Sequence, residues 1–384
     1  MVQKKLKSIH GQPSWTFSTD SVSAAVTQTA GMLGPVTFSL KNGDVSPFSI
    51  APWAENKKKI DKGLPPLLHA LRGDFFCLPF GGNDNPYRGE QHPPHGETAN
   101  ADWKFKKLKK KKGRRELHCR LKMKTRSGKV DKHIILRDGH TAVYQRHIVT
   151  GMSGAMTPGH HAMLKLPETP GCGRISTSAF VHGQVLPFPF ENPEIGGYHA
   201  LKPDSSFKNL SSVPMNDGTK TDLKTYPARK GFDDLVMVVA SQKTKLAWTA
   251  VTFAKSRQVY FALKDPGVLR NTILWMSNGG RHYAPWSGRH TAVLGIEDVT
   301  AYYHIGLAES VKKNPLKDKG FPTSVTLNKN KPFVVNYIMG MSDIPAGFDE
   351  VKSIRQVSGE EIEMVSVSGK RKTTKIDLDF LYGA

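Results

Sequence analysis

The sequence predicts an all-β protein built from large antiparallel sheets, arranged as a sandwich or a barrel. Short apolar–polar alternations recur along the whole chain, for example SWTFST from Ser14 and KLAWTAVTFA from Lys245. The 35 Gly and 25 Pro supply the turns that many short strands need. Helical periodicity is confined to two short segments, 304–314 and 346–356, so we expect one or two short helices.

The expected strands follow one another without a long linker or a repeat of fixed period. We therefore expect a single domain over residues 1–384 rather than two domains, a propeller or a solenoid. The irregular stretch 188–225 is predicted to form long loops, which in a compact domain are usually functional. In addition to SWTFST (14–19) and KLAWTAVTFA (245–254), the expected strands are AAVTQT (24–29), GPVTFSL (34–40), ELHCRLKMK (116–124), HIILRDGHTAVYQRHIV (133–149), LVMVVAS (235–241), QVYFALKD (258–265), TILWMSN (272–278), TAVLGIED (291–298), PFVVNYIMGM (332–341) and EIEMVSVSGKRKTTKIDLDFLY (361–382).

The net charge of +22 is concentrated in one segment. Between Lys104 and Lys132 there are 15 Lys or Arg and two acidic residues, so this segment carries more than half of the excess. Such a patch can bind phosphate backbones. Within it, however, Leu117, Cys119, Leu121 and Met123 alternate with polar residues, which indicates a strand with one solvated face. Exposed lysines also keep strand edges from aggregating.

Other classes of protein are disfavoured by the same sequence. No apolar run is long enough to span a bilayer, and the first residues lack the apolar core of a secretory signal. The three Cys lie far apart, which indicates neither a disulfide framework nor a zinc motif. We expect a cytoplasmic protein without membrane association, metal or other cofactor, as a monomer or homodimer.

Candidate acid–base residues stand at two strand positions. Glu297 follows the apolar run TAVLGI, so its carboxylate emerges from a buried strand. Partial desolvation raises the pKa of such a carboxylate and suits it to act as a general base, although an ordinary acid at a strand end remains an alternative. His161 begins a strand-like run after His160, and either a catalytic or a structural role is open for it.

Three further side chains are candidates for ligand contacts. His95 follows Pro93-Pro94, whose stiff backbone suits the precise placement of a hydrogen bond, and a turn residue is the alternative. Trp103 and Trp286 could stack on a ring-shaped ligand or lie in the core.

Taken together, these stretches resemble the aldose 1-epimerase (galactose mutarotase-like) family over residues 20–310. TQTAGMLGPVTFSL resembles its opening hairpin, and Arg88 followed by His95-Gly96 resembles its arginine and His-Gly pair. HAMLKL from His161 matches in spacing the strand that carries the family's acid, and AVLGIED ends in its catalytic Glu, here Glu297. The choice of His161 over His160 rests on this spacing.

The resemblance implies a β-supersandwich and a sugar-anomer isomerase with Glu297 as base and His161 as acid. It also implies a sugar or sugar phosphate as substrate. Ligand contacts are implied for Arg88, His95 and Trp286, with Asp233 as a substrate-binding carboxylate and Arg289 as a residue that orients Glu297.

Two alternatives differ in what they predict. A non-catalytic carbohydrate-binding protein of the same fold would keep sugar affinity after Glu297→Gln and would not change the rate of anomer exchange. A nucleic-acid-binding protein using Lys104 to Arg115 would lose affinity steeply with salt. The second alternative is disfavoured because Phe105 is the only aromatic in that run, whereas single-strand binders stack bases on several.

Overall fold

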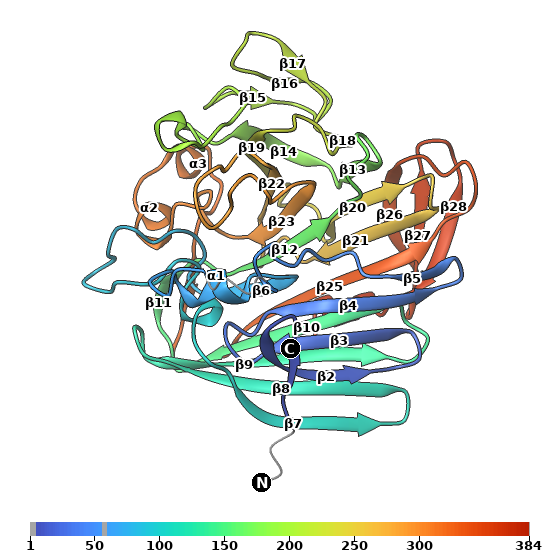
Figure 1. Cartoon of the computed structure of the whole chain (residues 1–384). Coiled ribbons are helices and arrows are strands. Elements are labelled where there is room, and N and C mark those ends of the chain that lie inside the picture. The colour runs from blue at the N-terminus through green and yellow to red at the C-terminus, as the bar shows by residue number, and fades with distance from the viewer. Residues whose placement is uncertain (1–4, 56–59, 384) are drawn as a thin grey trace.

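The computed structural model describes residues 5–55 and 60–383, and it confirms the all-β prediction (Figure 1). In these residues a sheet of 12 strands and a sheet of nine strands dominate, and their pairings are antiparallel. The 12-stranded sheet runs across in the order β1 (Lys7–Ile9), β2 (Gln12–Ser18), β3 (Val22–Thr27), β4 (Leu33–Leu40), β6 (Asp74–Cys77), β12 (Gly159–Lys165), β23 (Val293–Val299), β22 (Asn271–Asn278), β19 (Phe232–Ala240), β14 (Phe180–Val185) and β15 (Ser206–Phe207), with β5 (Gly43–Val45) paired to β4.

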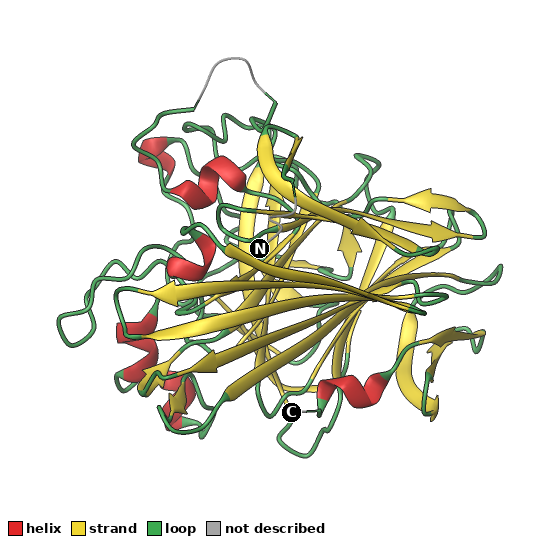
Figure 2. Ribbon diagram, turned by 90° about the horizontal axis from the view of Figure 1, so that it is seen from below, coloured by secondary structure: helices red, strands yellow, loops and turns green. Residues whose placement is uncertain are grey.

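The nine-stranded sheet packs against one face of the larger sheet, so that the strands form stacked layers with loops and short helices around them (Figure 2). Its order is β18 (Thr225–Tyr226), β13 (Gly173–Thr177), β20 (Ala247–Phe253), β21 (Gln258–Lys264), β25 (Phe333–Asp343), β10 (Ala142–Thr150), β9 (Gly128–Arg137), β8 (Arg114–Met123) and β7 (Lys104–Lys111).

Smaller elements complete the fold. Helices α1, α2 and α3 lie on the same side of the molecule (Figure 1). Their bounds, with those of the remaining elements, are α1 (Pro66–Ala70), α2 (Leu307–Val311), α3 (Pro315–Asp318), the 3₁₀ turns η1 (Glu97–Ala99), η2 (Pro193–Ile195) and η3 (Leu378–Leu381), the pairs β11 (Gly154–Met156) with β24 (Val325–Leu327) and β16 (Val213–Pro214) with β17 (Lys220–Thr221), and the sheet β26 (Val351–Ser358), β27 (Glu361–Ser366) and β28 (Arg371–Lys375). No helix in the described ranges is long and apolar enough to cross a membrane.

One of the two expected helices is present and one is wrong. Helix α2 lies inside the segment 304–314, as predicted. The segment 346–356 instead leads into strand β26, which pairs with β27 and buries Val351 and Ile354. The β-branched residues at these positions pack well in a sheet, and the partner strand that follows immediately overrides the weak helical pattern.

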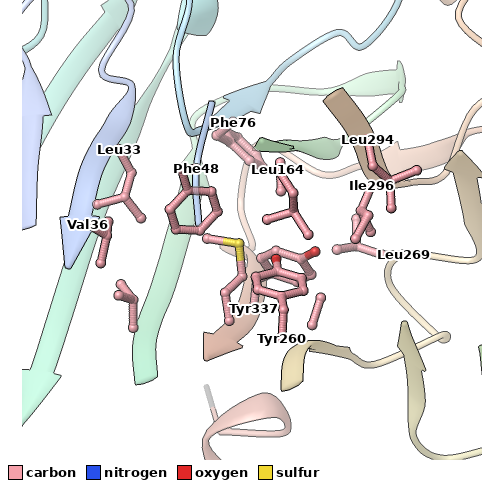
Figure 3. Close-up of a cluster of buried hydrophobic side chains, with 14 of the residues drawn as sticks. Leu33, Val36, Phe48, Phe76, Leu164, Tyr260, Leu269, Leu294, Ile296 and Tyr337 are labelled. Atoms are coloured by element: carbon pink, nitrogen blue, oxygen red, sulfur yellow. The ribbon is translucent and has the colours of Figure 1, made fainter. Parts of the chain in front are cut away.

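The core between the two large sheets comes from side chains that alternate along each strand. Figure 3 shows members of this core from both sheets facing one another, among them Leu164 of β12, Ile296 of β23, Tyr260 of β21 and Tyr337 of β25. Because successive side chains of a strand point to opposite faces, their neighbours in sequence must lie on the other face of the larger sheet.

The basic segment occupies the edge of the nine-stranded sheet. Strand β7 is the last strand in the order and its lysines are exposed, while Phe105 and Leu108 are half-buried. In β8 the side chains of Leu117, Cys119 and Leu121 are buried, as the alternation predicts. The lysines therefore give an edge strand a charged, solvent-exposed surface, and such a surface discourages pairing with a second chain.

Candidate active site

A cavity of about 220 Å³ lies on the face of the larger sheet that is turned away from the smaller one. Its walls are mostly apolar or aromatic, and a few polar side chains converge on it, which is typical of a small-molecule site. The lining residues are Pro65, Leu67, Leu68, Leu71, Phe75, Pro94, His95, His161, Phe190, Leu235, Trp275, Arg281, Trp286, Glu297 and His304.

Neighbouring strands β12 and β23 bring the two predicted catalytic residues together. His161 and Glu297 are directly opposite in the antiparallel register, and both side chains line the cavity. Their neighbours His160 and Asp298 point to the intersheet core, where His160 Nδ1 lies 2.9 Å from Asp74 and Tyr337 donates a hydrogen bond of 2.7 Å to Asp298. The alternation along β12 thus selects His161, and not His160, for the cavity.

His161 and Glu297 form a buried pair, and each has a polar atom that is open to a further hydrogen bond. His161 Nε2 lies 3.3 Å from Glu297 Oε1, and the two side chains are 7% and 3% exposed. Glu297 Oε2 and His161 Nδ1 are buried and have no hydrogen-bond partner within the described part of the chain. Since buried polar atoms are nearly always bonded, these two atoms are candidates for bonding to a ligand.

Burial shifts the pKa values of the pair in opposite directions. It raises the pKa of Glu297 to about 8, and Arg281 opposes this shift. Burial together with the neighbouring His95 holds the pKa of His161 well below its ordinary value. At neutral pH the pair therefore holds one proton, and the short distance lets that proton pass from the carboxyl group to the imidazole.

A glycine makes room for the carboxylate. Gly295 stands two residues before Glu297 on the same face and is opposite Trp275 in the register. A Cβ at Gly295 would lie 2.9 Å from the Cβ of Trp275 and 3.3 Å from Glu297 Oε1. The missing side chain allows the indole to pack over β23 beside the acid–base pair.

Arg281 is held by two carboxylates and three aromatic rings. Its Nε lies 2.6 Å from Glu191 Oε1 and 3.6 Å from Asp233 Oδ2. Its guanidinium lies over the rings of Phe190, Trp275 and Trp286, at 5.1, 4.9 and 4.7 Å from the centroids. Although burial disfavours its charge, the two carboxylates raise the pKa of Arg281, so it stays cationic.

Further histidines surround the pair without adding charge. Burial lowers the pKa of His95 to about 3 and that of His304 to about 4, so both rings are neutral at pH 7. His95 packs edge-on against His161, with the ring centroids 5.1 Å apart. Within the described residues, no three His, Cys, Asp or Glu side chains converge as a metal site would require.

The structure brings some of the residues predicted from sequence into the cavity and leaves others outside. Glu297, His161, His95 and Trp286 line it. Arg88 is exposed beside the ring of Tyr87, and it does not line the cavity.

The predicted roles of Arg289 and Asp233 also need correction. Arg289 is exposed and donates a 3.4 Å hydrogen bond to the carbonyl of Pro285. It does not line the cavity that holds Glu297, so it does not orient that carboxylate. Asp233 is fully buried behind the cavity, where it accepts hydrogen bonds from Trp275 Nε1 and from the backbone of Gly280. Its carboxylate holds Arg281 and the backbone of Gly280, and it does not line the cavity.

Trp103 belongs to the core, the second of the two roles left open for it. Its side chain is 1% exposed and donates a hydrogen bond of 3.0 Å to the carbonyl of Thr98. Lys132 lies over its ring, 4.7 Å from the centroid. This tryptophan stacks on the chain itself and is not a platform for a ligand.

Sequence reasoning missed Arg281, Glu191 and His304. All three lie in loops, where no periodicity assigns a direction to a side chain. Glu191 belongs to the stretch 188–225, whose length alone pointed to a function, and Arg281 follows Gly279-Gly280 at the end of β22. The Gly280 backbone passes so close to Asp233 that a Cβ on Gly280 would lie 2.2 Å from the backbone nitrogen of Asp233. The turn that carries Gly280 and Arg281 is therefore sterically constrained.

Replacing Arg281 with Met should destabilise the protein by about 3 kcal/mol, because Glu191 and Asp233 would be left buried without their cation. Denaturant unfolding would measure the loss. The matched control is Arg289→Met, which removes an exposed arginine and should change the free energy of unfolding by less than about 0.5 kcal/mol. Equal effects of the two substitutions would show that Arg281 does not stabilise the buried carboxylates of Glu191 and Asp233.

Comparison with solved structures shows that the chain has the galactose mutarotase-like fold. A galactose mutarotase related enzyme from Lactobacillus acidophilus matches with a TM-score of 0.54 and 12% identity, covering 86% of this chain and 97% of that one. A galactose mutarotase-like protein from Clostridium acetobutylicum matches at 0.55 and 12%, covering 88% and 98%. A candidate aldose 1-epimerase from Klebsiella pneumoniae matches at 0.60 and 12%, covering 87% and 80%.

Sequence comparison gives a different picture from structural comparison. No family model and no curated protein matches this chain. The likeness is therefore carried by the arrangement of the strands, and it identifies the fold.

Proposed function

We propose that this protein is an aldose 1-epimerase-like isomerase, which interconverts the anomers of a sugar with Glu297 as the general base and His161 as the general acid. The observation that carries the proposal is the buried pair of these two residues, 3.3 Å apart at the wall of the cavity, each with a polar atom that has no hydrogen-bond partner among the described residues. The fold shared with mutarotase-like proteins supports it.

The chemistry needs only one proton on this pair. Glu297 as carboxylate takes the proton of the C1 hydroxyl while protonated His161 gives its proton to the ring oxygen, and the bond between C1 and that oxygen breaks. After rotation about C1–C2, the reverse transfers close the ring on the other face. The C1 hydroxyl and the ring oxygen are bonded to the same carbon, so two groups that serve them must be close together, as His161 and Glu297 are.

The cavity around the pair favours a neutral sugar ring. Aromatic side chains such as Trp275 and Trp286 offer apolar faces, while His95 and His304 are neutral polar rings that can bond to hydroxyl groups. Arg281 is the one Arg or Lys among the described residues that line the cavity, and its charge is already balanced by Glu191 and Asp233. A phosphorylated sugar would require a free cation, so neutral aldoses are the preferred substrates.

The direct test is the optical rotation of freshly dissolved α-anomers of neutral aldoses, followed with and without the protein. Faster mutarotation than in buffer for at least one aldose supports the proposal. If aldoses bind without any acceleration, the protein is a carbohydrate-binding member of the fold and the catalytic proposal is wrong.

The pH dependence of this activity should follow the shared proton. Between the lowered pKa of His161 and the raised pKa of Glu297, about 8, the pair holds one proton and the rate is expected to be level. Above pH 8 the pair loses that proton, no acid remains, and the enzymatic rate should fall. A rate that rises through pH 8, after subtraction of the buffer reaction, would show that Glu297 works as a base without His161 as acid.

A further inference from the structure

A second cavity lies beside the first. Its volume is about 660 Å³, and both cavities are open to solvent. The two share Phe190, Arg281 and His304, so they are neighbours with these three side chains between them. The second cavity is otherwise lined by Pro189, Glu191, Asn192, Pro193, Ile195, His199 and Tyr283.

The loop that forms this cavity exposes an unusual share of apolar surface. Among the exposed large hydrophobic residues of the described chain, Phe188, Ile195 and Tyr198 fall within 11 residues of one another in sequence, and Ile195 is 60% exposed. Of these three, Ile195 lines the second cavity, and Phe188 packs against His304 of its wall with ring centroids 6.4 Å apart. Exposed apolar side chains beside a cavity mark ligand-binding surface more often than isolated ones do. The rings of Phe190 and Tyr283 add aromatic surface, on which a sugar face can stack.

The polar groups of the second cavity fit a neutral ligand with hydroxyl groups. Both oxygens of Glu191 are already engaged, one by Arg281 and one by the phenol of Tyr283. No other Arg or Lys lines the cavity within the described residues. At the wall shared with the first cavity, His304 Nδ1 is buried and has no partner in the described chain, so it is available to a ligand that reaches both cavities.

We propose that the second cavity is a subsite for a second sugar ring, and that the substrate is a neutral reducing disaccharide or longer oligosaccharide whose reducing end lies at Glu297 and His161. This inference rests on the proposed function and deepens it by naming the size of the substrate. The aromatic and apolar wall would hold the second ring, and the three shared side chains would lie under the glycosidic linkage.

The test compares anomer exchange of glucose and galactose with that of maltose, cellobiose and lactose, in the wild type and in Ile195→Ser. We expect kcat/KM for at least one disaccharide to exceed that for its reducing-end monosaccharide roughly tenfold, as a second desolvated ring would give. Ile195→Ser should raise KM for that disaccharide roughly threefold to tenfold and leave the monosaccharide kinetics unchanged. Val357→Ser, which changes an exposed apolar residue in the separate sheet of β26, β27 and β28, is the matched control and should alter neither.

The two proposals fail in distinguishable ways. If monosaccharides exchange faster than in buffer but no disaccharide is preferred, or if Ile195→Ser behaves like Val357→Ser, the subsite is wrong and the proposed function stands. If no sugar exchanges, the catalytic proposal is wrong, and binding of maltose, cellobiose and lactose followed by tryptophan fluorescence then decides the subsite. Disaccharides that bind more tightly than glucose and galactose, with the difference lost in Ile195→Ser, support it, and equal binding overturns it.

Discussion

Glu297→Gln should reduce anomer exchange to the rate in buffer, a loss of about 10²- to 10⁴-fold, the range that a positioned acid or base contributes. The substitution keeps the size of the side chain and a hydrogen-bonding group beside His161, but an amide cannot accept the proton of the C1 hydroxyl. Polarimetry on the neutral aldose that the wild type interconverts fastest would measure the loss.

A matched control separates chemistry from folding in this experiment. Glu168 is an exposed carboxylate that pairs with Lys165 at the surface, so Glu168→Gln should leave the rate unchanged. Undiminished exchange in Glu297→Gln, with the circular dichroism spectrum of the wild type, would rule out Glu297 as the base.

The same substitution should stabilise the protein at alkaline pH. The pKa of Glu297 is about 8 in the folded protein and 4.5 in its ordinary state, so the folded form retains a proton that the unfolded form releases between these values. The stability of the wild type therefore falls as pH rises from 4.5 to 8, whereas glutamine does not titrate. Across that window the difference in unfolding free energy between variant and wild type should grow by up to about 5 kcal/mol.

Urea unfolding at pH 5, 7 and 8.5 would measure this difference. The expected result is that Glu297→Gln gains on the wild type at each step, while Glu168→Gln follows the wild type closely, because an exposed pair contributes little. A difference that stays constant with pH would mean that the carboxyl group of Glu297 is not desolvated in the folded protein. Loss of activity together with gain of stability would mark Glu297 as a residue kept for function.

Alternation along strands is the part of the fold and of the site that the sequence could reveal. The runs HAMLKL and AVLGIED are recognisable as strands, and a period of two then places His161 on the opposite face of its strand from His160, and Glu297 on the opposite face from Asp298. What no single sequence shows is that residues 136 positions apart become register partners, since this depends on the order of strands across the sheet.

The loop residues of the site could not be predicted from the sequence, because tertiary contacts determine where their side chains lie. The resemblance points to Arg88 by its order along the chain and to Arg289 as a partner of Glu297, yet both side chains are exposed, and Arg281 lines the cavity with Glu297. Its position depends on Glu191, 90 residues away, and on three aromatic rings from separate segments. A loop side chain is placed by such tertiary contacts, and no local pattern records them.

NMR saturation transfer between the two anomeric proton signals of a neutral aldose would show whether Glu297 and His161 together catalyse anomer exchange. The measurement would compare wild type, Glu297→Gln and His161→Gln at pH 7. We expect rapid transfer with the wild type and the buffer rate with each variant. Transfer that survives in either variant, or a wild type that binds the sugar without accelerating its exchange, would contradict it.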